Sequence, residues 1–191
     1  MKRVVFFIVV FIICTYAGSI ENGINWLKLN QNENGNWTDS LVSDFHATSY
    51  SVITLEKYNQ TNSHYTQGIN WIQNEQVQIL DYLALQTIIL DDANILVQEK
   101  LEILSQAQNP DAGFGITKNY NSSILDASLV LKTLLRSGNS QIISNGLNFI
   151  KNYQNVDGGW GIKINDPSNI YVTSLVIDFF SNCGQFDVGT A

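Results

Sequence analysis

Two glycine-rich stretches are the first candidates for chemistry in this sequence. Residues 108–115 are QNPDAGFG and residues 154–161 are QNVDGGWG. A glycine-rich loop holds phosphate when it follows a strand, leads into a helix and is accompanied by a lysine. No strand pattern precedes Gly158–Gly161, and the stretch has no phosphate-holding lysine. The chain also shows no serine nucleophile elbow and no dinucleotide-binding glycine pattern, so nucleotide chemistry is not predicted.

The remaining reactive side chains are sparse and scattered. Cys183, His46 and His64 are far apart in sequence and lack the spacing of zinc ligands. Asp91 and Asp92 stand next to each other where an apolar run ends, which favours a solvated helix junction. We therefore expect no metal and no cofactor.

The N-terminus has the pattern of a secretory signal. Lys2 and Arg3 precede the apolar run 4–14, and small residues follow at the two positions that a signal peptidase reads, which predicts residues 1–17 as a signal peptide cleaved after Ala17. An uncleaved membrane anchor is the alternative. Cleavage takes the formal charge from −7 to −9, because two basic residues and no acid are lost. An acidic chain without a basic cluster does not bind nucleic acid through its phosphates.

Cleavage would leave one cysteine, Cys183, near the C-terminus. It excludes an internal disulfide but leaves open a disulfide between two chains in an oxidising compartment.

A repeat runs through residues 18–191. Gly23-Ile-Asn-Trp recurs as Gly68-Ile-Asn-Trp and as Gly146-Leu-Asn-Phe, and a fourth copy without the glycine begins near residue 100. Each copy leads to a glutamine, and all but the second continue into a glycine and an aromatic residue. The motif residues are Gln31, Gly35 and Trp37, then Gln108, Gly113 and Phe114, then Gln154, Gly158 and Trp160.

Each repeat predicts two helices. The first half has apolar residues at helical spacing, as in residues 143–150, and the second half is apolar on most sides. The more apolar halves are residues 47–55, 80–90, 124–135 and 170–180. We expect an all-α fold: an α/α toroid or open solenoid of about four helix pairs, with an inner and an outer helix layer.

These motifs resemble the QW-type repeat of squalene and oxidosqualene cyclases and of protein prenyltransferase β subunits. The resemblance covers residues 18–191 and implies an α/α toroid in which the motif glutamine and tryptophan are structural braces. A glutamine amide both donates and accepts, so it can satisfy backbone groups at a helix end. A tryptophan ring fills the space between helices.

The catalytic equipment that this resemblance would require is incomplete. The acidic motif Asp-x-Asp-Asp has its best match at Asp91-Asp92, but Ile89 stands where the first aspartate belongs. The zinc set of Asp, Cys and His is not assembled either. Cys183-Gly-Gln is similar to the thioester motif of complement-like proteins, but Phe186 occupies the place of its glutamine. The balance is therefore against an enzyme, with no catalytic residue assigned.

A binding site is expected at the mouth of the inner helices. Aligning those helices places Asp81 and Asp126 at one level, with tyrosines within a turn of it. The candidate residues are His46, Tyr50, Asp81, Tyr82, Asp126 and Tyr171. Acids in a first helical turn are also favoured by the helix dipole alone, which is the structural explanation for both aspartates.

The sequence thus predicts a secreted, non-catalytic repeat module that binds a protein partner or a small ligand. The alternative is a diverged terpenoid- or polyprenyl-handling protein that binds an apolar small molecule, as an intramolecular cyclase or a prenyl-chain binder. Four repeats are few for a closed ring, so a homo-oligomer that completes the toroid, or a larger enzyme assembled from several copies, is a further alternative.

Overall fold

The computed structural model describes residues 18–183, and all of its regular elements are helices. No strand occurs in this range; two isolated β-bridges join Phe114 to Ser123 and Ser123 to Lys163. The expected all-α class is therefore confirmed. The predicted signal peptide, residues 1–17, lies outside the described residues.

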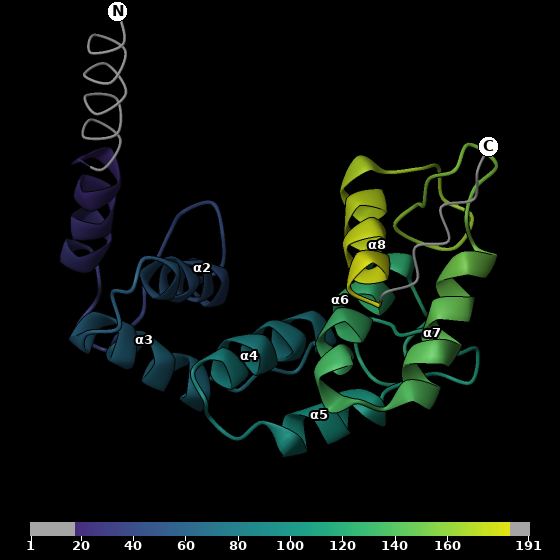
Figure 1. Cartoon of the computed structure of the whole chain (residues 1–191), viewed down its shortest axis with the longest axis horizontal. Helices are drawn as coiled ribbons and strands as arrows, with labels where there is room; N and C mark the ends of the chain where they lie inside the picture. The colour runs from purple at the N-terminus through teal and green to yellow at the C-terminus, as the bar shows by residue number, and fades with distance from the viewer. Residues whose placement is uncertain (1–17, 184–191) are drawn as a thin grey trace, which may run out of the picture. The chain divides into compact units, whose positions relative to one another are not determined.

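The chain divides into two compact parts, one ending at Glu75 and the other beginning at Gln76. The N-terminal part contains a helix at residues 18–29, then α2 (Asp44–Lys57) and α3 (Ser63–Asn74), with α3 packed against α2 (Figure 1).

The C-terminal part contains five α-helices, one of which, α6, is central. They are α4 (Leu80–Asp92), α5 (Gln98–Ser105), α6 (Ile124–Leu134), α7 (Ser140–Asn152) and α8 (Ile170–Asn182), with a 3₁₀ turn η1 (Leu135–Ser137) after α6. Helix α6 packs against α4 and α8 on either side, and α5 and α7 also pack against it. The centre of this part is therefore the apolar surface of α6.

Burial differs between the helices. In α6 the buried residues face several directions, whereas α7 buries one face around Gly146 and Phe149 and exposes the other. Helix α4 resembles α6 in this respect. Helix α8 is equally apolar in sequence but buries only Val172, Val176 and Phe179. This exception becomes important below.

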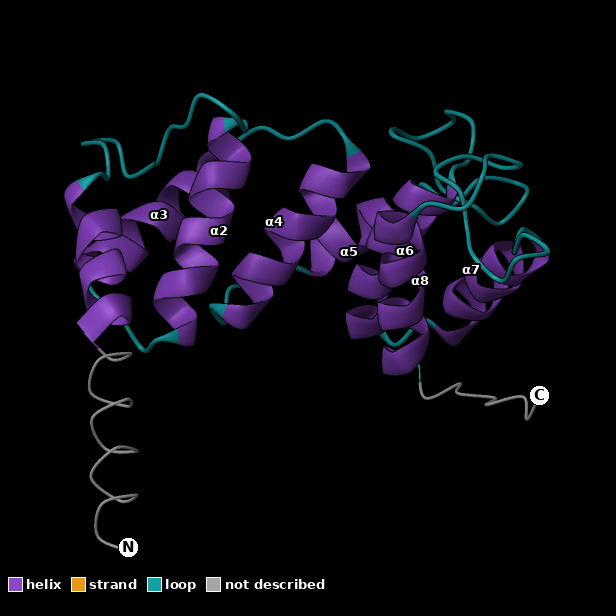
Figure 2. Ribbon diagram, turned by 90° about the horizontal axis from the view of Figure 1, so that it is seen from above, coloured by secondary structure: helices purple, strands orange, loops and turns teal. Residues whose placement is uncertain are grey.

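Several helices begin at a side-chain cap. Ser43, Ser123 and Asn169 precede α2, α6 and α8, and each accepts a hydrogen bond from a backbone N–H in the first turn. Serine and asparagine are preferred there because their oxygens satisfy donors that have no partner within the helix. The loops 108–123 and 154–169 precede these caps of α6 and α8 and gather at that end of the C-terminal part (Figure 2).

Among residues 18–183, none of the helices has both the length and the apolar character needed to cross a bilayer.

Candidate functional site

The motif glutamines hold the loops that follow the first helix of each repeat. Their amide nitrogens donate to the carbonyl oxygen four residues later: Gln31 to Gly35, Gln108 to Ala112 and Gln154 to Gly158, at 2.7–3.0 Å. In each loop the residue after the glutamine also donates its backbone N–H to the oxygen four residues later. The three loops therefore share one backbone conformation.

Two of these glutamines also contact the next helix. Gln31 Nε2 donates to the His64 carbonyl at 2.9 Å, and Gln108 Nε2 donates to the Ile142 carbonyl at 3.1 Å. His64 Nδ1 in turn lies 2.7 Å from Gln31 Oε1. Both oxygens lie near the first turn of a helix, so the amide joins one repeat to the beginning of the next. His64 belongs to this brace and has no other role on the structural evidence.

The two motif tryptophans occupy equivalent positions. The indole Nε1 of Trp37 donates to the Leu27 carbonyl at 2.7 Å, and that of Trp160 donates to the Ile150 carbonyl at 2.8 Å. Both oxygens lie ten residues before the tryptophan. Phe114 replaces the indole in the third repeat and is fully buried without such a bond.

Threonine hydroxyls complete the two tryptophan sites. The backbone N–H of Trp37 donates to Thr48 Oγ1, and that of Trp160 donates to Thr173 Oγ1, both at 3.0 Å. In the third repeat, the residue at the position of Thr173 is Ala127, which is buried.

In the third repeat the positive φ of the loop falls on an alanine and not on the motif glycine. The fourth residue after each glutamine has a positive φ: +94° at Gly35, +70° at Ala112 and +86° at Gly158. Gly113 is the fifth residue, in the register of Gly159. An alanine therefore occupies a left-handed conformation that favours glycine. Gly113 is required for a different reason, because a Cβ there would lie 2.6 Å from the Phe149 ring and from Ser122.

The C-terminal part also contains an open cavity of about 970 Å³ at the N-terminal end of α6. Volumes of this order are usual for binding sites. The cavity is lined by Asn109, Pro110, Asp111, Ile116, residues 119–123, Leu125, Asp126 and residues 162–164. It thus lies between the loops 108–123 and 154–169, with α6 forming its floor.

Hydrogen bonds hold the polar wall of the cavity in place. Asp111 Oδ1 accepts from the Ser122 hydroxyl at 2.8 Å, and Asn109 Nδ2 donates to the same hydroxyl at 2.9 Å and to the Tyr120 carbonyl at 2.7 Å. A wall organised in this way presents its remaining oxygens and amides to a ligand without rearrangement.

Asp126 is the titratable group on the floor of the cavity. Its carboxylate accepts from the Ser123 hydroxyl at 2.6 Å while the Ser123 oxygen accepts the Asp126 backbone N–H at 3.0 Å, so Ser123 caps the helix and also holds the Asp126 carboxylate. Burial raises the pKa of Asp126; the Ser123 hydrogen bond lowers it, and the nearby charge of Asp81 raises it further. Of the two predicted aspartates, Asp126 lines the cavity, whereas Asp81 does not line it and acts on Asp126 only through its charge.

The other predicted site residues lie elsewhere or outside this cavity. Helix α2 holds His46 and Tyr50 one turn apart, with stacked rings whose centroids are 6.3 Å apart, and His46 Nδ1 lies 3.2 Å from Ser43 Oγ. Both residues belong to the N-terminal part. Tyr82 follows Asp81 and donates its backbone N–H to that carboxylate, and Tyr171 is exposed in the first turn of α8. Neither Tyr82 nor Tyr171 lines the cavity.

Two other candidates from the sequence have structural surroundings. Asp91 and Asp92 both accept from Arg136 Nη1, at 2.5 and 2.8 Å. These ion pairs join the end of α4 to the 3₁₀ turn after α6. Cys183 is a free, half-buried thiol, and burial raises its pKa, which makes it a poorer nucleophile. Within residues 18–183, no group of three or more His, Cys, Asp and Glu side chains is placed to hold a metal ion.

Sequence reasoning missed most of the cavity wall. Tyr120, Ile162 and Lys163 line it from loops that were interpreted only as helix-to-helix connections. The sequence did contain a signal, because the loops 108–123 and 154–169 match at a spacing of 46 residues and both contain an asparagine at the equivalent position, Asn119 and Asn165. In the structure both asparagines have a positive φ. Loops that share such irregular detail have a defined shape rather than a variable one.

Comparison with known proteins adds no relative. No known protein family matches this chain, and no curated protein matches it either.

Proposed function

We propose that this protein is a non-catalytic α-helical repeat module that binds a partner protein through the cavity between the loops 108–123 and 154–169. The observation that carries the proposal is the cavity itself, which two equivalent loops build and which contains the half-buried Asp126 carboxylate. Binding sites characteristically combine apolar walls with a few well-placed polar groups. Here Ile116, Leu125 and Ile162 provide the apolar part.

The cavity chemistry favours a basic peptide segment as the ligand. Two acids, Asp111 and Asp126, line it against one lysine, Lys163. Asp81 adds negative charge that affects the pKa of Asp126, and the chain has a formal charge of −7. A lysine or arginine side chain of the ligand would offset the negative charges of Asp81 and Asp126 and so favour the ionised form of both carboxylates. The asparagine amides and the Tyr120 hydroxyl suit the polar groups of a peptide backbone.

The repeat class is part of the same proposal. The Gln31 and Gln108 bonds to the start of the following helix support successive stacking of helix pairs, as in an α/α toroid or solenoid. This agrees with the likeness of the motifs to the repeats of squalene cyclases and prenyltransferase β subunits. Fold alone does not determine activity, so the cavity residues carry the functional part.

The alternative, a protein that handles terpenoid or polyprenyl chains, is less well supported. A prenyl chain needs a largely apolar pocket, whereas this cavity has asparagine, aspartate, serine and lysine in its wall. A polar wall left without hydrogen-bonding partners would weaken the binding of a hydrocarbon.

Export from the cell is proposed on the sequence alone, from the apolar run 4–14 with Lys2 and Arg3 before it. A secreted module would meet its partner outside the cytoplasm, where a peptide segment of another exported or surface protein is available.

Calorimetric titration with short peptides tests the proposal. Octapeptides with a central lysine or arginine are compared with the same peptides carrying leucine or glutamine at that place. We expect the basic peptides to bind, and the Asp126→Asn protein to bind them at least about tenfold more weakly, because a charge-assisted bond is replaced by a neutral one.

Asp44→Asn is the matched control, because Asp44 is also an acid in the first turn of a capped helix but belongs to α2. It should leave the affinity unchanged. Equal affinity for leucine and lysine peptides, or equal loss in both variants, would refute the proposal. Tight binding of squalene-like compounds together with indifference to every peptide would instead favour the terpenoid alternative.

A further inference from the structure

Glycines mark the places where one repeat packs on the one before it. A Cβ on Gly146 of α7 would lie 2.5 Å from the Leu131 side chain of α6, and a Cβ on Gly68 of α3 would lie 2.6 Å from Val52 of α2. Leu131 and Val52 are fully buried beneath these helices. Each apolar side chain therefore occupies the space that a glycine, having no side chain, leaves on the following helix.

The last repeat has the equivalent apolar side chain, but no helix of the described residues covers it. Ile177 of α8 follows Leu131 by 46 residues, the spacing that separates the equivalent loops. Leu131 is 0% exposed and Ile177 is 51% exposed. No described residue takes the place at Ile177 that Gly146 takes at Leu131.

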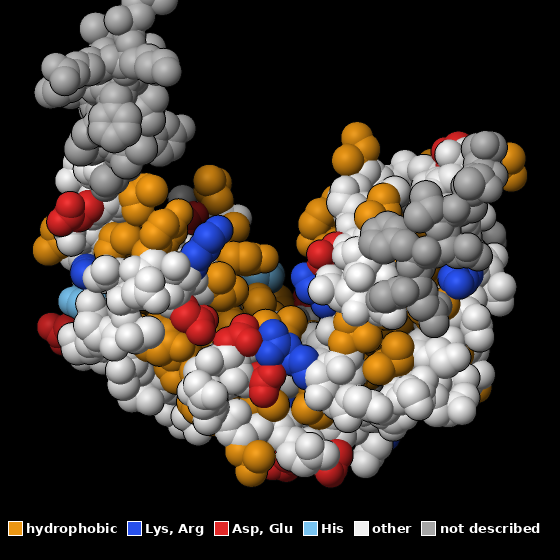
Figure 3. Space-filling model, viewed as in Figure 1, with side chains coloured by type: hydrophobic (Ala, Val, Ile, Leu, Met, Phe, Trp, Pro, Cys, Tyr) orange, Lys and Arg blue, Asp and Glu red, His pale blue; other side chains and the backbone are white. Residues whose placement is uncertain are grey.

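The beginning of α8 shows the same vacancy. Leu80 and Ile124 begin α4 and α6, and their backbone N–H groups donate to the Ile116 and Ile162 carbonyls of the following loops, at 2.9 and 3.1 Å. Ile124 is 1% exposed, whereas its counterpart Ile170 is 89% exposed, and no loop of the described chain accepts its N–H. In the space-filling view, apolar side chains reach the surface over α8 (Figure 3).

The loop of the last repeat is also uncovered. Gln154 donates to Gly158 but has no second bond of the kind that Gln108 makes to Ile142, among the bonds of residues 18–183. Space near Gly158 is open, whereas a Cβ on Gly35, its counterpart in the first repeat, would meet the backbone of Gln67 in the next helix. We call Gln154, Gly158, Gly159, Ile170 and Ile177 the tail surface.

In the first repeat, the glycine and the aromatic residue that contact a preceding repeat elsewhere in the chain are exposed. Gly23 lies at the position of Gly68 and Gly146, but no atom is within 4 Å of a Cβ built on it. Trp26 corresponds to Phe149; Trp26 is 63% exposed, and Phe149 is 3% exposed beneath Gly113. We call Ser19, Gly23 and Trp26 the head surface.

We propose that the tail surface of one copy of this protein binds the head surface of a second copy. Ile177 would pack against Gly23 as Leu131 packs against Gly146. Trp26 would pack against Gly159, whose nearest neighbours are Ser168 and Thr173, as Phe149 packs against Gly113.

The glutamine of the last repeat provides a directional polar contact in this interface. Gln31 and Gln108 donate to carbonyls four residues before Gly68 and Gly146, namely those of His64 and Ile142. The residue four before Gly23 is Ser19. Gln154 of one copy would therefore donate to the Ser19 carbonyl of the next.

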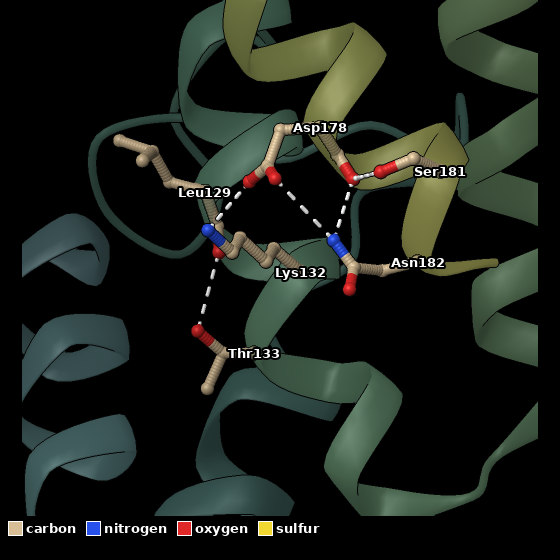
Figure 4. A network of polar contacts seen from close by, with 6 residues as sticks. All are labelled: Leu129, Lys132, Thr133, Asp178, Ser181 and Asn182. Carbon is tan, nitrogen blue, oxygen red and sulfur yellow. Dashed lines mark hydrogen bonds and ion pairs between the residues drawn. The ribbon is translucent and has the colours of Figure 1, made fainter. Parts of the chain in front are cut away.

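The tail surface is held in shape before any partner arrives. Lys132 of α6 pairs with Asp178 of α8 at 2.5 Å, and the Asp178 carbonyl accepts from the Ser181 hydroxyl and the Asn182 amide at 2.8 and 2.7 Å (Figure 4). These contacts join α8 to α6 and brace its last turn next to Ile177. The interface thus meets a preformed helix face, which reduces the entropic cost of association.

Because the two surfaces differ, the contact is heterologous and can be tested by complementation. The full chain, produced in a secreting host and kept under reductant so that Cys183 cannot link copies, is followed by sedimentation over a concentration series. We expect concentration-dependent association. Gly23→Leu and Ile177→Asp should each raise the dissociation constant at least about tenfold. The leucine would occupy the space that Ile177 needs at Gly23, and the aspartate would replace the apolar side chain with a charge.

Both substitutions are at exposed positions, so the fold of each variant should be intact, as circular dichroism and thermal unfolding can verify. Leu96→Asp, the same kind of change at a more exposed apolar residue between α4 and α5, is the control and should associate like the unchanged protein.

An equimolar mixture of the Gly23→Leu and Ile177→Asp proteins separates this interface from others. The first keeps its tail surface and the second its head surface, so the mixture should form a one-to-one dimer with nearly the original affinity. A strict monomer over the whole series, as expected if the ends are covered within one chain or by a foreign protein, would overturn the proposal. Self-association that the mixture fails to restore would overturn it equally.

Discussion

The loops 108–123 and 154–169 share one backbone conformation but fill it differently. In both, an asparagine and an aspartate clamp a serine eleven or thirteen residues further on: Asn109 and Asp111 with Ser122, and Asn155 and Asp157 with Ser168. The aromatic ring beneath the loop is Phe114 in one and Trp160 in the other.

The difference extends into the following helix. Trp160 is accompanied by Thr173, whose hydroxyl accepts the Trp160 backbone N–H, while Phe114 is accompanied by Ala127. The loss of the indole donor thus coincides with the loss of the hydroxyl. Loop shape is therefore set by the polar clamp, and the ring and its neighbour vary together to fill the space below.

Exchanging the two rings between the loops should have the largest effect on the free energy of unfolding. We expect Phe114→Trp to cost about 1–3 kcal/mol of unfolding free energy, because Phe114 is fully buried and a larger ring overpacks the site. Trp160→Phe should cost about 1–2 kcal/mol, because the bond to the Ile150 carbonyl is lost. Urea unfolding monitored by far-UV circular dichroism measures both. If either exchange is neutral, the two fillings are interchangeable and the proposed pairing of ring and helix residue is wrong.

Reciprocal changes at the positive-φ position should have opposite signs. Ala112→Gly is expected to stabilise the chain by roughly 0.5–1 kcal/mol, and Gly158→Ala to destabilise it by about 1–2 kcal/mol, because alanine is disfavoured at φ of +70° and +86°. Gly158 has open space around it, so the second effect reports the backbone alone. Thermal unfolding is sufficient to obtain the signs. A destabilised Ala112→Gly protein would show that the two loops differ in conformation after all.

The smallest effect should be a difference in pH dependence between Asp126, in the helix that follows the loop 108–123, and Asp157, within the loop 154–169. Burial raises the pKa of Asp126 above its ordinary value of 3.8, so the folded chain holds that proton more tightly than the unfolded chain does. Its contribution to stability is therefore complete below about pH 3.8 and is lost as pH rises through the raised pKa. Hydrogen bonds from Ser168 and from the Gly159 backbone lower the pKa of Asp157, which has the opposite consequence.

Asp157 contributes stability above its ordinary pKa of 3.8, and this contribution disappears as pH falls through the lowered value. Unfolding free energies measured from pH 3 to pH 7 for Asp126→Asn and Asp157→Asn should therefore differ from those of the unchanged chain with slopes of opposite sign. Parallel slopes would contradict the assignment of these two environments.

Part of the architecture was accessible from the sequence because it depends on local spacing. Helical periodicity and the recurring glycines predict the helices. The structural role of Gln31, Gln108 and Gln154 was expected from their recurrence together with the resemblance to QW-type repeats. Asp81 and Asp126 both lie in the first turn of a helix, as their alignment in the sequence indicates.

The rest depends on contacts that spacing does not reveal. Gly113 attracts attention as a motif glycine, yet Ala112 has the positive φ. Arg136 holds Asp91 and Asp92 from more than forty residues away, and Tyr120 lines the cavity from a loop without periodicity. The exposed state of α8 was equally hidden, because an apolar helix is expected to be buried and its covering repeat is missing from the described chain.

Amide hydrogen exchange at Ile170, compared with that at Ile124, tests the central claim most directly. The claim is that these are equivalent positions, one covered by the following loop and one left open for a second copy. We predict slow exchange at Ile124 at every concentration, and exchange at Ile170 that is fast in dilute solution and slows as the protein concentration rises. Fast exchange at Ile170 that is unaffected by concentration would contradict the account, and so would slow exchange at Ile170 in dilute solution.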